Sequence, residues 1–196
     1  MMGPIHLSVD DRVAVITIDR TERRNALNLD ALEALDTAVA DALRQGAAAI
    51  VFTGAGGHFC AGADLKELED HTFDTRLRGV LENVATAPVP TFAAISGACM
   101  GLGMQLALAC DIRVATDDAY FGIPAGKLGL VVNHWTLQRL AHFFGFGAAR
   151  LIVLTASTVS FDDAWRYGFV QTRGGLDTAR DLATSSAALA PLSLQG

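Results

Sequence analysis

Apolar residues along the chain follow two different periods, and segments with one period alternate with segments that have the other. Alternating or continuous β-branched runs predict strands at 6–9, 13–18, 47–53, 90–95, 111–115, 119–121 and 168–171. Helical spacing and capping residues predict helices at 29–43, 65–70, 75–86, 104–109, 135–144, 147–154, 160–165 and 176–190. Strands that alternate with helices indicate β-α-β units, and therefore a fold of the α/β class.

The stretch 97–111 is the centre of this pattern, because a strand leads into it, glycines bend it and a nearly all-apolar helix leaves it. A helix that is apolar on every face lies inside a protein. Its first turn carries unpaired N–H groups and a partial positive charge, which suit an oxyanion. Gln105 is the strongly polar side chain of that turn, so we expect the chemistry of the protein to be decided there.

The composition fits one well-buried globular domain, which we expect to span residues 1–196. The chain is 51% apolar and 18% charged, with a net charge of −6. This charge argues against nucleic acid or an anionic membrane surface as the main partner. No apolar run reaches the roughly 18 residues that a membrane span needs. Asp10, Asp11 and Arg12 interrupt any apolar signal peptide.

Three cysteines, Cys60, Cys99 and Cys110, lack the spacing of a metal site, and we expect no bound metal. An odd number of cysteines without an export signal favours reduced thiols and a cytoplasmic location. The cysteines are interpreted as small buried hydrophobes. A nucleophilic role stays open for Cys60, which lies beside a glycine-rich loop.

That loop, residues 54–64, matches no phosphate-binding pattern, because it lacks a Walker Lys-Ser/Thr pair and a GxGxxG in the right context. Two interpretations remain. The loop is either a surface connector or a segment whose N–H groups approach a ligand carbonyl. In the second case, one N–H from this loop and one from the helix start at 101–105 would form an oxyanion hole.

An acid or base to accompany such a hole is not obvious in the sequence. Gln105 cannot transfer a proton, and the loop 121–129 contains no carboxylate. Lys127 and His134 are the titratable side chains between Tyr120 and Arg139. His134 is the candidate base, and the alternative is a histidine that packs or lies on a polar rim.

Five segments occur together in the order and spacing of a known family. They are Arg24-Asn25-Ala26-Leu27, 59–68, 97–111, Phe121-Gly122-Ile123-Pro124 and Gln138-Arg139-Leu140. Through them the chain resembles the crotonase superfamily, also called the enoyl-CoA hydratase/isomerase family. The resemblance implies a crotonase-like spiral of ββα units, with C-terminal helices that support a homotrimer or a dimer of trimers. It also implies a coenzyme A thioester as ligand, no permanently bound cofactor, and a role in fatty-acid or lipid metabolism.

Carried over residue by residue, the family's oxyanion-hole donors fall on the backbone N–H groups of Ala63 and Leu102. Its contacts to coenzyme A fall on Ala26, Leu27, Ala61, Ala63 and Lys66, with Arg24 as a weaker candidate for a phosphate contact. Hydratases that this chain resembles carry their two catalytic glutamates where this sequence has Gln105 and Ala125.

Two departures from the family therefore shape the functional hypothesis. Without both glutamates, the resemblance is to a subgroup that binds long-chain acyl-CoA without turnover, and the segment 127–135 is similar to that subgroup. The sequence ends at Gly196, so we expect a shortened C-terminal helical part.

Three hypotheses follow. We favour an acyl-CoA-binding protein of crotonase fold without hydratase activity. The alternatives are an active family enzyme with a relocated acid or base, such as His134 or Asp64, and a scaffold or regulatory subunit that binds no acyl-CoA.

Overall fold

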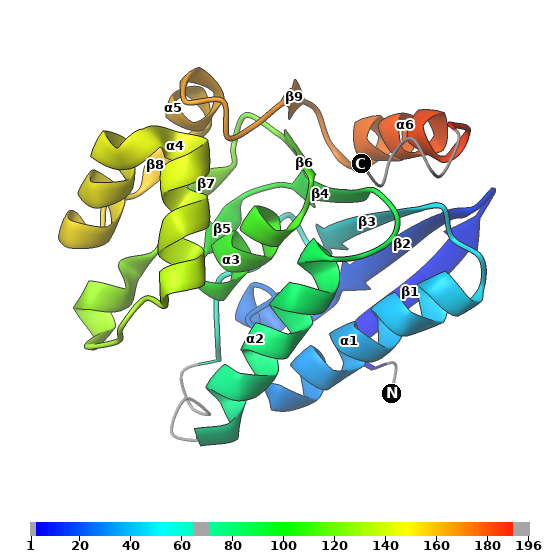
Figure 1. The fold of residues 1–196 in the computed structure, drawn as a ribbon, viewed down its shortest axis with the longest axis horizontal. Helices are drawn as coiled ribbons and strands as arrows, with labels where there is room; N and C mark the ends of the chain where they lie inside the picture. The colour runs from blue at the N-terminus through cyan, green and yellow to red at the C-terminus, as the bar shows by residue number, and fades with distance from the viewer. Residues whose placement is uncertain (1–2, 65–70, 190–196) are drawn as a thin grey trace.

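Two β-sheets organise the fold, and helices cover both faces of the larger sheet (Figure 1). The structure is a computed structural model that describes residues 3–64 and 71–189. Its strands are β1 (Ile5–Asp10), β2 (Val13–Ile18), β3 (Ala49–Gly54), β4 (Thr91–Ile95), β5 (Ala98–Met100), β6 (Ile112–Ala115), β7 (Tyr120–Gly122), β8 (Val159–Ser160) and β9 (Thr172–Arg173). Its helices are α1 (Leu29–Arg44), α2 (His71–Ala85), α3 (Leu102–Ala109), α4 (His134–Thr155), α5 (Phe161–Arg166) and α6 (Leu176–Ala187), with 3-10 turns η1 (Thr21–Arg23) and η3 (Pro124–Leu128).

The larger sheet has the order β1-β2-β3-β4-β6-β9, and the smaller sheet has the order β5-β7-β8. β1 pairs antiparallel with β2, and every later pair in the larger sheet is parallel. Parallel neighbours need a crossover connection, and α1 and α2 provide two of them. The expected α/β class with ββα units is confirmed.

The central strands are apolar on both faces because each face meets a helical layer. Side chains such as Ile16 and Phe52 point into the main core, which α1, α2 and α3 share. Their neighbours Val15 and Val51 point to the other face, where α6 packs through a stripe of alanines. Figure 1 shows α1 and α2 on one side of the sheet and α6 on the opposite side.

Most predicted elements are confirmed, including the strands β1 and β2 and the helix α1. The Asn28 side chain accepts a hydrogen bond from the N–H of Ala31, 3.1 Å away, and so caps the N-terminus of α1. The helix predicted at 65–70 lies outside the described residues. None of the helices within 3–64 and 71–189 is long and apolar enough to cross a membrane.

Several predicted boundaries are wrong. The bend after Gly97 contains the short strand β5, and α3 begins at Leu102 rather than at residue 104. The helix predicted at 75–86 begins four residues earlier, and the loop expected at 121–129 contains η3. By contrast, the two helices predicted at 135–144 and 147–154 are confirmed, because α4 consists of two helical parts separated at Gly145, whose φ of 75° and ψ of 158° are not helical.

The strand predicted at 168–171 is also displaced, to 172–173. Gly168 has a positive φ of 80°, and the amides of Phe169 and Val170 both reach back to the carbonyl of Ala164. These apolar residues therefore fill the core from a turn that ends α5, and sheet pairing starts only after them.

Candidate functional site

Two segments that are distant in sequence, 24–27 and 60–64, lie side by side and carry most of the predicted binding residues. The Ala61 N–H donates to the Arg24 carbonyl over 3.0 Å, and the Leu27 N–H donates to the Gly62 carbonyl over 2.9 Å. The Asp64 N–H donates back to the Leu27 carbonyl over 2.8 Å. These bonds form a parallel bridge between Leu27 and Ala63.

This bridge sets the direction of the Ala63 N–H. The described peptide bonds include no cis bond, and in a trans peptide the C=O and the next N–H point in opposite directions. Because the Gly62 carbonyl faces Leu27, the N–H of Ala63 points away from it. Gly62 has a positive φ of 123°, a conformation that glycine adopts without strain.

The N–H of Leu102 is directed by the same principle. Leu102 is the first residue of α3, and the Gly101 carbonyl accepts the first helical hydrogen bond, from the Gln105 N–H at 3.0 Å. The Leu102 N–H therefore points outward from the helix N-terminus. Among the residues that the structure describes, no acceptor is found for the N–H of Ala63 or of Leu102.

The loop that carries Ala63 and the turn that begins α3 are in direct contact. Cys60 pairs with Cys99 in a second parallel bridge, with the Met100 N–H 2.9 Å from the Cys60 carbonyl. A Cβ added to Gly103 would lie 2.3 Å from that same carbonyl, so only glycine permits this approach. The two segments that the resemblance selects are thus brought together.

Gln105 lies in the first turn of α3, and Ala125 lies in η3. Gln105 is partly buried, and its Oε1 is a buried acceptor without a hydrogen-bond partner within the described part of the chain. The Gly101 N–H donates to the Gly122 carbonyl over 2.8 Å, which fixes the segment that leads into η3 and Ala125 beside this turn. Neither residue offers an ionisable group there.

The two alternative bases are placed differently. His134 is exposed at the start of α4 and lines a surface groove of about 450 Å³, together with residues of α4 only. Asp64 is held in an ion pair with Arg20, with 3.3 Å between the carboxylate and the guanidinium. The groove at His134 is thus separate from the contact between the 60–64 loop and the start of α3.

The predicted coenzyme A contacts are distributed over the same two segments. Arg24 is exposed, and its φ of 49° is left-handed. Ala26 and Ala61 are partly buried, whereas Leu27 is fully buried and uses both of its backbone groups on 62–64. Lys66 lies outside the described residues.

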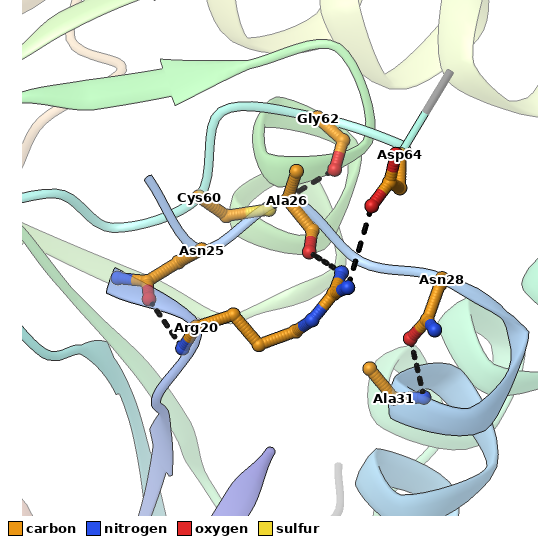
Figure 2. A network of polar contacts seen from close by, with 8 residues as sticks. All are labelled: Arg20, Asn25, Ala26, Asn28, Ala31, Cys60, Gly62 and Asp64. Carbon is orange, nitrogen blue, oxygen red and sulfur yellow. Dashed lines mark hydrogen bonds and ion pairs between the residues drawn. The ribbon is translucent and has the colours of Figure 1, made fainter. Parts of the chain in front are cut away.

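Sequence reasoning missed the polar network that supports this region (Figure 2). The Arg20 guanidinium donates to the Ala26 carbonyl and pairs with Asp64. Asn25 is fully buried with a φ of 60°, and its amide donates to the carbonyls of Ala55 and His58 over 2.8 and 2.6 Å. Tolerance of a left-handed conformation is a known property of asparagine, but the sequence carries no signal for its partners.

The cysteines lie in this region but are poor nucleophiles. Burial raises the pKa of Cys60 to about 12, against smaller opposing effects of the Gly62 carbonyl contact and the Arg20 charge. Burial likewise raises the pKa of Cys99 and of Cys110. Thiols that stay protonated do not attack. Within 3–64 and 71–189, no group of three or more His, Cys, Asp or Glu side chains could hold a metal ion.

Comparisons with known proteins identify the class. The family model described as enoyl-CoA hydratase/isomerase matches residues 8–188. The chain is 38% identical over 192 residues to the probable enoyl-CoA hydratase echA6 of Mycobacterium tuberculosis, covering 97% of this chain and 79% of that protein. It is 33% identical over 206 residues to the short-chain-enoyl-CoA hydratase of Clostridium acetobutylicum, covering 99% and 79%.

Comparison with solved structures leads to the same family. The crystal structure of an enoyl-CoA hydratase/isomerase from Xanthobacter autotrophicus Py2 superposes with a TM-score of 0.91 at 28% identity, covering all of this chain and 77% of that one. The fold and the paired segments are thus those of a crotonase-fold protein. The chain belongs to the enoyl-CoA hydratase/isomerase family.

Proposed function

We propose that this protein binds a coenzyme A thioester, and that the thioester oxygen accepts hydrogen bonds from the N–H groups of Ala63 and Leu102. The observation that carries the proposal is the contact between the 60–64 loop and the start of α3, because each segment presents an N–H for which the described residues provide no acceptor. Two such donors, fixed before the ligand arrives, stabilise negative charge on a carbonyl oxygen. Exposed Arg24 is a candidate partner for a phosphate of the ligand.

We further propose that the protein has no hydratase activity. Addition of water to an enoyl thioester needs one group that deprotonates the water and one that protonates the α-carbon. Each such group contributes roughly 10²–10⁴-fold. The amide of Gln105 and the methyl group of Ala125 can do neither, so polarisation of the carbonyl is what remains.

The binding proposal is tested by removing a single donor. Leu102 is the first helical position, where proline is tolerated although it lacks an N–H. Gly101, at φ 52° and ψ −114°, has the mirror image of the extended conformation that normally precedes proline, so Leu102→Pro is compatible with the backbone. Leu102→Ala is the matched control, because it removes the buried side chain and keeps the N–H.

We expect Leu102→Pro to weaken binding of acyl-CoAs about five- to tenfold relative to Leu102→Ala, measured by isothermal titration over chain lengths C4 to C16. Equal affinities of the two variants would contradict the carbonyl contact. Absence of binding by the wild-type protein at every chain length would favour the scaffold hypothesis. Hydration of a short enoyl-CoA above trace rate would contradict the loss of activity.

We also propose that the protein assembles as a homo-oligomer, such as a trimer. The supporting observation is that a single helix, α4, exposes four large apolar side chains, a concentration that favours an interaction surface: Leu137, Phe146, Leu151 and Leu154. Light scattering after size-exclusion chromatography tests this. A monomer at micromolar concentration would contradict it.

A further inference from the structure

The guanidinium of Arg20 is connected to the N–H of Ala63 through two peptide groups. It donates a hydrogen bond to the Ala26 carbonyl, as Figure 2 shows. That carbonyl shares a peptide group with the Leu27 N–H, which donates to the Gly62 carbonyl over 2.9 Å. The Gly62 carbonyl in turn shares a peptide group with the Ala63 N–H. All the groups in this series donate in the same direction.

Such a series strengthens its last donor. Each hydrogen bond polarises the peptide group that accepts it, so the N–H on the far side becomes a better donor. A full positive charge at the first position increases this effect, since a guanidinium is a strong, permanently charged donor. The Arg20 side chain is 16% exposed, so water screens the interaction only in part.

Arg20 has two further partners, one on each of the two segments. Its backbone N–H donates to the Asn25 side chain over 2.9 Å. Its guanidinium lies 3.3 Å from the carboxylate of Asp64, whose side chain is 13% exposed. Asp64 directly follows Ala63, and Ala26 directly precedes Leu27. The guanidinium therefore contacts a neighbour of each residue in the Leu27–Ala63 bridge.

From this geometry we propose that Arg20 is a positioning residue that aligns and polarises the Ala63 N–H toward the thioester oxygen of the ligand. The inference rests on the proposed function, because it requires that oxygen to bind at Ala63. On this inference Arg20 does not touch the ligand. Its substitution changes the interaction with the carbonyl oxygen and with no other part of the acyl-coenzyme A.

The test compares two ligands that differ at that oxygen alone. An S-acyl coenzyme A and the S-alkyl coenzyme A of equal chain length share the nucleotide and the chain, but the thioether lacks the carbonyl. The ratio of their dissociation constants therefore isolates the carbonyl contact. The variants are Arg20→Gln and, as a matched control, Arg23→Gln, because Arg23 is exposed on the same 3-10 turn.

We expect Arg20→Gln to reduce the preference for the thioester about three- to tenfold and Arg23→Gln to leave it unchanged. The infrared C=O stretch of the bound thioester should move toward its value in water in Arg20→Gln alone. An unchanged ratio and an unchanged stretch in folded Arg20→Gln would overturn this inference. A wild-type protein without any thioester preference would instead overturn the carbonyl contact of the proposed function, and this inference with it.

Asp64→Asn provides a second variant if Arg20→Gln does not fold. It removes the neutralising carboxylate and leaves the guanidinium beside the Ala26 carbonyl, so the thioester preference should persist or rise. A loss of preference in Asp64→Asn would overturn the inference, because it would show that the ion pair itself, rather than the series of peptide groups, supports the contact.

Discussion

The three buried thiols make the stability of the protein sensitive to alkaline pH. In the folded state burial raises the pKa of Cys60 from 9.0 to about 12, and raises the pKa of Cys99 and Cys110 as well. Above pH 9 the unfolded chain releases thiol protons that the folded chain retains. The folded state then binds more protons, so the free energy of unfolding falls as the pH rises. This contribution is fully present below pH 9 and is lost toward the folded-state pKa.

The size of the effect follows from the same linkage. At pH 9.5, each thiol that titrates at 9.0 when unfolded and stays protonated when folded lowers the free energy of unfolding by about 0.8 kcal/mol. The three thiols together give about 2.5 kcal/mol, a large part of the 5–15 kcal/mol typical of a domain. Arg113 acts in the opposite direction, since burial lowers its pKa to about 10, but this contribution develops only above pH 10.

Urea unfolding between pH 7 and pH 9.5, under a reductant, measures this dependence. The control is a variant with Cys60→Ala, Cys99→Ala and Cys110→Ala, in which all other titrating groups remain. Its absolute stability will be lower, but its free energy of unfolding should lack the thiol contribution to the pH dependence. Parallel curves for the wild-type protein and the variant would refute the reasoning, because the alkaline loss would then come from other groups.

Three further predictions concern substitutions of individual side chains, the last of them in combination. Asn25→Asp should lower the free energy of unfolding by about 2–4 kcal/mol in urea, because a carboxylate cannot donate to the two carbonyls that the amide holds. Arg113→Met should cost at least about 3 kcal/mol, since it removes the guanidinium donor from four backbone carbonyls, of which that of Phe169 keeps the Gln171 amide as a second donor; a stable variant would contradict this. The double change Gln105→Glu and Ala125→Glu should raise hydration of a short enoyl-CoA at least about 10²-fold over the wild-type protein, whereas either change alone should do much less.

The sequence predicts well the elements that are long enough to show a hydrophobic period. The helix α1 has six buried residues on one face and an asparagine cap, and its predicted start agrees with the structure. Strand β5 has three residues and no period of its own, so it was not predicted. Its existence depends on pairing with β7 and with Cys60, contacts that no local pattern encodes.

Buried arginines are a second kind of feature that the sequence does not predict. Arg113 is almost completely buried, and its guanidinium donates to main-chain carbonyls and lies 4.2 Å from the Phe143 ring. Arginine is usually exposed, and carbonyl acceptors leave no trace in a sequence, so its role could not be predicted. The contact of Arg20 with the Ala26 carbonyl is hidden from the sequence for the same reason. Ala63 and Leu102 were found through the family resemblance, since an N–H group is common to nearly all residues.

A site built from main-chain donors separates binding from catalysis. The direction of the Ala63 N–H depends on the bond from Leu27 to Gly62, and that of the Leu102 N–H depends on the bond from Gln105 to Gly101. Both bonds join backbone atoms, so neither depends on which side chain occupies position 105 or 125. On the proposed function, replacing two carboxylates therefore removes proton transfer and leaves the carbonyl contact intact. This is why the double glutamate variant should gain activity without a change in thioester affinity, and a gain in affinity alone would show that the two functions are not separable here.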